Sequence, residues 1–343
     1  MANLSVFGAG SWGTAFAHLA SSRGHNVCLW CRRPQQARAI ATSGRNPDYL
    51  EDIPLSPNLL PTGNLAEAAI FAERWVFAVL AQSFRELAGK LRPLAPRNVR
   101  VCNLAKGFEI TTGKAMSQVC HETLPMAVYS VLSGPCHAEE VVQGLPTAVV
   151  VASALFEEAF EWQVLLTGNT FRVYTNEDVT GVEIGGAVKN VVAIAAGITQ
   201  GMGLGDNAVA ALATRGLAEI LRLGARLGAN PLTLTGLAGV GDLMTTCYSR
   251  HSRNFRLGFS VGKGMPPGEA LLRLGQVAEG YYTAQALREH ADSFGVELPI
   301  VEGVFRILHE NAAPRDILDE LLLRDPKPEL SPELLWGGRE TGA

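Results

Sequence analysis

The sequence predicts an α/β protein in which an N-terminal, doubly wound and mainly parallel sheet is followed by an all-α C-terminal domain. Short β-rich runs alternate with helical stretches in the first half, whereas long Ala-, Leu- and Gly-rich segments with helical spacing fill the second. A chain of 343 residues is also longer than a domain with a single hydrophobic core usually is, so two domains are expected. We place them at residues 1–181 and 182–343, and we expect the Pro- and Gly-containing tail after about residue 325 to be poorly ordered.

The β-rich runs of the first half have the spacing of βαβ units. Each is short and apolar, and helix-forming residues precede the next one. This rhythm is typical of a parallel sheet with helices on both faces. The expected strands cover residues 4–7, 27–30, 75–79, 99–103, 127–132, 147–152 and 171–174. From residue 182 onward no convincing strand appears, so segments such as 207–228 are expected to be helical.

Composition favours a soluble, cytoplasmic protein. Apolar residues make up 47% of the chain, charged residues 18%, and the net charge is -4, so nothing favours binding to nucleic acid or to a membrane surface. The N-terminus lacks the basic and apolar regions of a secretory signal, and the apolar run 187–198 is too short and too polar to span a bilayer. The six cysteines are scattered through apolar segments, as is typical of reduced cytosolic thiols.

A glycine-rich turn follows the first expected strand and reads GAGSWG over residues 8–13. In this setting Gly8 permits the tight turn, Gly10 lets the backbone approach a pyrophosphate, and Gly13 allows the next helix to pack against the strand. The N–H groups and dipole of that helix then face the anion. Because the motif begins a βαβ unit, we expect a Rossmann-type dinucleotide site rather than a merely glycine-rich turn.

The residues after the second expected strand bear on the choice of dinucleotide. An acidic residue there would bind the ribose 2′-hydroxyl and repel a 2′-phosphate, and none occurs in LWCRRP, residues 29–34. Arg32 and Arg33 suit a 2′-phosphate, so we expect NADP(H) to be preferred, with NAD(H) as a second cofactor. The alternative is that either arginine is an ordinary solvated charge. Cys28 and Cys31 project from opposite faces of the strand and have no second Cys/His pair, so no metal is expected.

Three polar features stand out in the predicted helical domain. Lys189 interrupts the small and apolar residues of 185–196, where it must reach water, find a partner or lower its pKa. The last two outcomes suit a general acid/base, and the first is an equal alternative. Asp242 follows a glycine-rich turn and is most simply the N-cap of the next helix. The triplet Ser252, Arg253 and Asn254 suits a small phosphate, although an arginine in a loop is usually solvated.

In the predicted sheet domain, two further turns follow strands at the edge where open α/β sheets place ligands. Lys106 follows the strand near residues 101–104, and Gly134 follows the strand 127–132. Glu139 and Glu140 are consecutive and point apart on a helix, so we interpret them as first-turn acids that favour the helix dipole.

Several long motifs occur in a fixed order: GAGSWGTA at 8–15, NLAKGFE at 103–109, SGPCHAEE at 133–140 and GGAVKNVVAIAAG at 185–197, then TRGLAEILRLG, GLAGVGDL, SRNFRLG and VAEGYYTA. With them the chain resembles the bacterial-type NAD(P)-dependent glycerol-3-phosphate dehydrogenase family along almost its whole length. The resemblance implies hydride transfer from the nicotinamide C4 to the carbonyl carbon of dihydroxyacetone phosphate. The product, sn-glycerol 3-phosphate, would supply glycerophospholipid synthesis.

The resemblance also implies roles for individual residues. Lys189 would be the general acid/base, and Asp242 would support it. The substrate contacts would be Lys106, Gly134, Cys136, Lys189, Asp242, Ser252, Arg253 and Asn254. Besides the three glycines Gly8, Gly10 and Gly13, the cofactor contacts would be Ser11, Trp12, Arg32, Arg33, Lys106, Ala138, Arg253, Val277 and Glu279.

Two departures from the family pattern affect this site. Residues 79–82 read VLAQ where members usually carry a Val-Pro-Ser-like turn, and Cys136, a poorer hydrogen-bond donor, stands where members carry Ser or Thr. Two alternatives stay open: a related two-domain dehydrogenase for a hydroxy or keto acid, and a non-catalytic NADP(H)-binding regulator. The joint presence of Lys189, Asp242 and Arg253 counts against the regulator. A homodimer is expected only because two-fold oligomers are common.

Overall fold

The computed structural model describes residues 1–326 and 328–329, so most of the tail predicted to be poorly ordered lies outside the described residues. The chain divides into two compact units. The first comprises residues 1–106 and 114–179, and the second comprises residues 107–113 and the chain from 180 onward. The sequence did not indicate that the short segment 107–113 belongs with the second unit.

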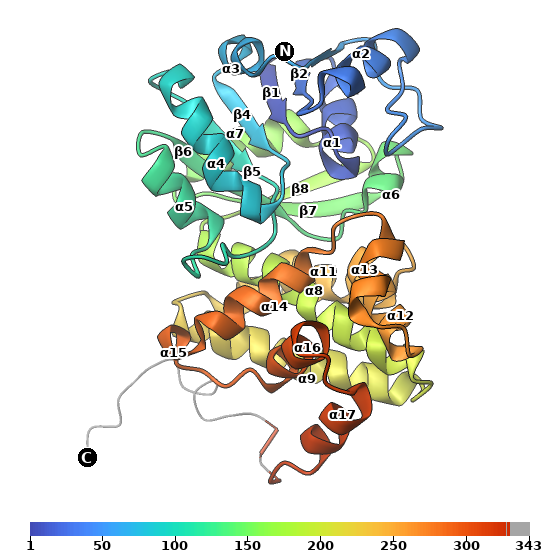
Figure 1. Cartoon of the computed structure of the whole chain (residues 1–343). Coiled ribbons are helices and arrows are strands. Elements are labelled where there is room, and N and C mark those ends of the chain that lie inside the picture. The colour runs from blue at the N-terminus through green and yellow to red at the C-terminus, as the bar shows by residue number, and fades with distance from the viewer. Residues whose placement is uncertain (327, 330–343) are drawn as a thin grey trace, which may run out of the picture. The chain divides into compact units, whose positions relative to one another are not determined.

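The first unit is built on one sheet (Figure 1). Its strand order is β3-β2-β1-β4-β5-β6-β7-β8. Neighbouring strands pair in parallel except β6 and β7, which are antiparallel. This arrangement confirms the predicted doubly wound, mainly parallel sheet. The strands are β1 (Asn3–Phe7), β2 (Asn26–Trp30), β3 (Leu59–Thr62), β4 (Arg74–Phe77), β5 (Arg100–Asn103), β6 (Val128–Ser133), β7 (Thr147–Ala152) and β8 (Phe171–Asn176).

One strand, β3, was not expected from the sequence. Its four residues read LLPT, and a proline within such a short run argues against a strand because it cannot donate to the ladder. The structure places β3 at the edge of the sheet, where it pairs only with β2 and Pro61 lies opposite Leu29. An edge strand tolerates proline, since one side of it needs no partner.

Alternating side chains of the strands fill two separate cores, one on each face of the sheet. On β1, Val6 belongs to one core and Phe7 to the other, as the period of two requires. One core includes side chains of α1 (Ser11–Ser22), α2 (Pro34–Ser43), α6 (Ala138–Val142) and α7 (Phe156–Leu166). The opposite core includes side chains of α3 (Leu65–Phe71), α4 (Ala81–Leu91) and α5 (Met116–Thr123), and a 3-10 turn, η1 (Arg92–Leu94), follows α4. Helices therefore cover both faces, and the carboxyl ends of the strands carry the loops with the predicted motifs.

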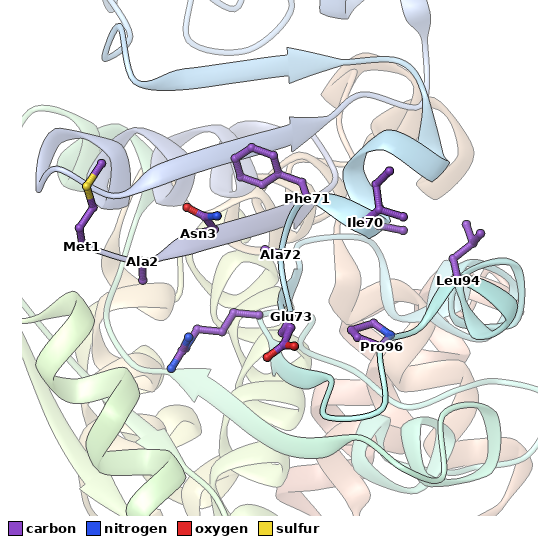
Figure 2. Close-up of a pocket in the computed structure, with 11 residues that line it drawn as sticks. Met1, Ala2, Asn3, Ile70, Phe71, Ala72, Glu73, Leu94 and Pro96 are labelled. Atoms are coloured by element: carbon purple, nitrogen blue, oxygen red, sulfur yellow. The ribbon is translucent and has the colours of Figure 1, made fainter.

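A cavity of about 620 Å³ opens at the amino ends of β1 and β4. Figure 2 shows its lining, which includes Met1, Asn3, Glu73, Leu94 and Pro96. It lies at the strand ends opposite to the glycine-rich turn, whereas open α/β sheets bind their ligands beyond the carboxyl ends. We therefore assign no functional role to this cavity.

The second unit is helical, and its described residues contain no strand, as predicted. Its elements are α8 (Val179–Gly201), α9 (Asp206–Arg226), α10 (Pro231–Leu234), the π-helical turn η2 (Leu237–Gly241), α11 (Asp242–Tyr248), α12 (Arg253–Gly262), α13 (Pro267–Leu274), α14 (Glu279–Glu289), α15 (Ala291–Phe294), α16 (Pro299–His309) and α17 (Pro314–Leu322). By length and composition α8 could cross a membrane, but its whole apolar window is buried inside the protein. Helix α8 is thus the core helix of this unit.

Small residues let α8 and α12 approach closely. A Cβ atom at Gly258 would lie 1.9 Å from the carbonyl oxygen of Ile194, and one at Gly197 would lie 2.2 Å from that of Phe255. Both distances are far inside van der Waals contact, so only glycine allows these backbones to meet. The crossing fixes the start of α12 relative to the middle of α8, the two places where the sequence predicts substrate-binding residues.

Candidate active site

The glycine-rich turn has the geometry that a dinucleotide site requires. Gly8 adopts a φ of 115°, which disfavours any side chain, and a Cβ there would lie 2.5 Å from the carbonyl oxygen of Ala78. A Cβ at Gly13 would lie 1.9 Å from the carbonyl oxygen of Gly8, so α1 can pack against β1 only with glycine at this position. The tasks predicted for the first and third glycines thus have a structural counterpart.

The N-terminus of α1 suits an anion. Its cap residue, Gly10, provides no side-chain hydrogen bond, and the first turn carries no acidic residue. A Cβ at Gly10 would meet nothing within 4 Å, so the missing side chain leaves open space beside the first N–H groups of the helix. Ser11 and Trp12 begin this helix, and the buried Trp12 Nε1 makes no hydrogen bond to the described residues. These residues fit the pyrophosphate of a nicotinamide dinucleotide.

Two buried amides hold the glycine-rich turn in place, and the sequence analysis missed both. The carbonyl oxygen of Ala9 accepts hydrogen bonds from Gln36 Nε2 at 2.9 Å and from Asn46 Nδ2 at 3.0 Å. Asn46 Nδ2 also donates to the hydroxyl of Thr14 on α1 at 2.8 Å, and Gln36 Nε2 donates to Asn46 Oδ1 at 3.2 Å. The turn is therefore fastened to α2 and to the loop that follows it.

The two arginines after β2 are both exposed but lie in different surroundings. Arg33 forms an ion pair with Asp48, with 2.7 Å between Nη2 and Oδ2. Arg32 makes no ion pair within the part of the chain that the structure describes. An acidic residue therefore does lie beside this predicted 2′-phosphate site, although it comes from a later loop and not from the end of the strand.

The structure brings together three of the predicted substrate residues in the first unit. Lys106 Nζ donates a hydrogen bond to the carbonyl oxygen of Gly134 at 3.3 Å and lies 3.9 Å from Cys136 Sγ. The thiol of Cys136 itself points to the same carbonyl, with 3.0 Å between Sγ and oxygen. Ala138 begins α6 close by and packs with Ala15 of α1 in a small core cluster.

In the second unit, Lys189 is buried, with 6% of its surface exposed, and it contacts a carboxylate and a hydroxyl group. Its Nζ lies 2.8 Å from Oδ1 of Asp242 and 2.6 Å from Oγ1 of Thr246. Asp242 is also buried, with 3% exposed. Of the three outcomes considered for this lysine, the structure contains a buried lysine with partners rather than one that reaches water. An opposite charge this close favours the ammonium form of a buried lysine and restricts its orientation.

Asp242 does not cap a helix in the simple way that its sequence position indicates. It is the first residue of α11, the cap position belongs to Gly241, and the aspartate side chain binds Lys189 instead. Thr246 lies four residues later on the same face of α11, and its hydroxyl also donates to the carbonyl oxygen of Asp242 at 2.6 Å. The sequence analysis missed Thr246; its spacing of four from Asp242 was the available signal.

The predicted phosphate-binding triplet forms the N-terminus of α12. Ser252 is the cap residue, and its hydroxyl oxygen accepts a hydrogen bond from the N–H of Phe255 at 3.1 Å. Asn254 is buried and links two helices: Nδ2 donates to Asn190 Oδ1 at 2.8 Å, and Oδ1 accepts from the N–H of Gly280 at 3.0 Å. Arg253, Val277 and Glu279 are half-buried beside these elements. Asn254 thus has a structural task as well as its predicted contact with substrate.

The thiols of Cys28 and Cys31, on β2 and directly after it, are both buried. Burial raises the pKa of Cys28 to about 11 and that of Cys31 to about 12, so both are protonated at neutral pH. All six cysteines are free.

Two family models, several similar relatives and a similar solved structure point to the same family. The model described as NAD-dependent glycerol-3-phosphate dehydrogenase N-terminus matches residues 3–159, and the corresponding C-terminus model matches residues 178–319. The chain is 47% identical to glycerol-3-phosphate dehydrogenase [NAD(P)+] 2 of Salinibacter ruber, over 95% of this chain and 96% of that one. It is 46% identical to the enzyme of Moorella thermoacetica, over 94% and 96%. A solved structure of glycerol-3-phosphate dehydrogenase from Coxiella burnetii superposes with a TM-score of 0.91 at 37% identity, covering 94% of this chain and 99% of that one.

Proposed function

Because the chain belongs to the NAD-dependent glycerol-3-phosphate dehydrogenase family, we propose that Lys189 is the general acid/base of its reaction. The protein is an NAD(P)-dependent oxidoreductase that interconverts dihydroxyacetone phosphate and glycerol 3-phosphate, a precursor of glycerophospholipids. The observation that supports the proposal is the buried contact of Lys189 with Asp242 and Thr246. A bound nicotinamide supplies the hydride, and the protein must supply the proton.

The Lys189 ammonium would donate that proton to the substrate oxygen during reduction and take it back during oxidation. Burial alone would favour the neutral amine, which cannot donate in this way. The Asp242 carboxylate at 2.8 Å favours the charged form, and the Thr246 hydroxyl at 2.6 Å restricts where the ammonium points. A group that is already oriented needs little reorganisation when charge develops on the substrate oxygen.

The substrate phosphate would bind at the start of α12. Arg253 offers a guanidinium group, and the helix N-terminus adds N–H groups and the positive end of its dipole. Ser252 and Asn254 flank the arginine. The energy of binding the phosphate at this helix start would be used to orient the reacting carbonyl. Lys106 and Gly134, which belong to the first unit, are further proposed contacts of the substrate. Cys136 would be a weak contact, because its thiol is a poor donor and already points to the Gly134 carbonyl.

The cofactor would occupy the turn of Gly8, Gly10 and Gly13, with Ser11 and Trp12 at its pyrophosphate, and the remaining predicted contacts are Arg32, Arg33, Lys106, Ala138, Arg253, Val277 and Glu279. We expect NADP(H) to be preferred because both arginines are exposed after β2, and we expect NAD(H) to be accepted as well. We also propose a cytoplasmic location, which free cysteines and a fully buried apolar helix support. We also propose that the protein forms a homodimer, because two-fold dimers are the commonest oligomers of soluble proteins.

A spectrophotometric assay tests the role of Lys189. We expect the purified protein to oxidise NADPH when dihydroxyacetone phosphate is added. Lys189→Ala should abolish turnover, whereas its affinity for NADP+ should stay within about twofold of the wild-type value because the lysine lies outside the glycine-rich turn. Turnover retained in this variant refutes the assignment. Activity only with a hydroxy or keto acid would support the related dehydrogenase, and binding without any turnover would support the regulator.

A further inference from the structure

Asp48 lies against one of the two arginines expected to recognise a 2′-phosphate. Its Oδ2 accepts a hydrogen bond from Arg33 Nη2 at 2.7 Å, and both side chains are partly exposed. We propose that Asp48 is a specificity-determining residue that weakens the preference for NADP(H) and lets the enzyme use NAD(H). This inference rests on the proposed function, because it concerns the cofactor of the same site.

The position of Arg33 makes its partner relevant to cofactor choice. Arg33 is the cap residue of α2 and follows the carboxyl end of β2, where dinucleotide folds bind the adenosine ribose. A carboxylate there opposes a 2′-phosphate in two ways: it occupies the guanidinium, and it repels the added negative charge. With NAD(H), the same carboxylate is available to accept a hydrogen bond from the 2′-hydroxyl. An acid at the end of the second strand normally has this role, and here Asp48 provides it from a position 15 residues after Arg33.

The carboxylate is not a freely moving surface charge, because Asn46 fixes the loop that carries it. Asn46 is fully buried, and its Oδ1 accepts a hydrogen bond from the N–H of Asp48 at 3.2 Å. The other hydrogen bonds of this amide reach Ala9 of the glycine-rich turn, Thr14 of α1 and Gln36 of α2. The place of Asp48 is therefore set relative to the turn that binds the pyrophosphate.

The two arginines differ in a way that fits the use of both cofactors. Arg32 makes no ion pair among the described residues. Its charge still acts on Glu86 of α4, whose pKa is lowered mainly by the hydrogen bond from Lys90 and more weakly by Arg32. Arg32 is thus available to a 2′-phosphate, whereas Arg33 must first leave Asp48. An exposed ion pair is held weakly, so NADP(H) can displace Asp48, but binding is weaker than two unpaired arginines would give.

Removal of the Asp48 charge tests the inference. Asp48→Asn keeps the shape of the side chain and the backbone bond to Asn46. We expect the Kd of 2′,5′-ADP and of NADP+, measured by isothermal titration calorimetry, to fall roughly threefold to tenfold. The Kd of NAD+ should stay the same or rise. The ratio of kcat/KM for NADPH over NADH should increase by a similar factor.

Two further variants isolate the cause. Asp52→Asn removes the same charge from an exposed position in the same loop, where no ion pair occurs among the described residues, so it should leave all three Kd values unchanged. In an Arg33→Gln background, Asp48→Asn should shift the Kd of 2′,5′-ADP much less. An unchanged Kd of 2′,5′-ADP in Asp48→Asn, or an equal shift of that Kd in Asp52→Asn, overturns the inference. Failure of the proposed function appears separately, as cofactor binding without reduction of dihydroxyacetone phosphate in the wild type.

Discussion

Replacement of Thr246 by valine removes one polar partner of Lys189 with little change in the volume of the side chain. The lost hydrogen bond joins a buried ammonium to a hydroxyl over 2.6 Å. Hydrogen bonds to charged groups contribute about 1.5–3 kcal/mol. If that energy holds the ammonium where the substrate oxygen needs it, the barrier rises by a similar amount, and kcat should fall roughly 10- to 100-fold. Because Thr246 contacts Lys189 and not the predicted phosphate site, KM should change much less.

A matched serine variant and a measurement of stability separate the loss of this hydrogen bond from a general loss of folding. Thr246→Ser keeps the hydroxyl and should retain kcat within about threefold, whereas Thr246→Val also leaves the carbonyl oxygen of Asp242 without this donor and should lower stability by about 1–2 kcal/mol. Steady-state assays with dihydroxyacetone phosphate and urea unfolding measure the two effects. A Thr246→Val enzyme that is less stable but has the wild-type kcat would refute a positioning role, as would a serine variant as slow as the valine variant.

Two other predictions concern the second unit. Burial raises the pKa of Glu219 to about 7 from an ordinary value of 4.5, so the folded state binds this proton more tightly than the unfolded chain does. The contribution of the protonated Glu219 to stability is full below pH 4.5 and is lost as the pH rises through 7, a change of roughly 3 kcal/mol. Glu219→Gln should abolish this change, as measured by urea unfolding across pH 5–8. Gly258→Ala should lower the free energy of unfolding by more than about 2 kcal/mol, because the new Cβ would meet the Ile194 carbonyl. Gly268 faces open space, so Gly268→Ala should be nearly neutral. Equal effects of the two substitutions would contradict the role given to close packing at Gly258.

Features carried by local patterns were predictable from the sequence. Strands buried on both faces read as apolar runs, and the turn GAGSWG needs glycine for reasons of backbone geometry that the motif itself expresses. The unusual place of Lys189 among small apolar residues was also visible. Its partner, Asp242, could be named only through the family resemblance, because it lies 53 residues away and only the packing of helices brings the two side chains together.

Features that depend on long-range contacts were not predictable in this way. The strand β3 violates local strand preferences and exists because β2 offers it an edge. The segment 107–113 joins the second unit through contacts far along the chain: the carbonyl oxygen of Ile110 lies 2.8 Å from His290 Nε2, and the ring of Phe108 packs near that of Phe294. Asn46 and Asp48 read as ordinary loop residues. Their importance comes from partners in three other elements, which no local pattern reveals.

The glycine-rich segment before Asp242 explains how Lys189 acquires its partner. A Cβ at Gly239 would lie 1.7 Å from the carbonyl oxygen of Leu234, and a Cβ at Gly185 would lie 2.6 Å from that of Ala238, so η2 can press against α8 one turn before Lys189. The π-helical turn also sets the rotation of α11. Because each helical residue turns the chain by about 100°, a register shift of one residue would carry the Asp242 side chain away from the lysine. The glycines of the turn that precedes Asp242 therefore fix the orientation of the carboxylate beside Lys189.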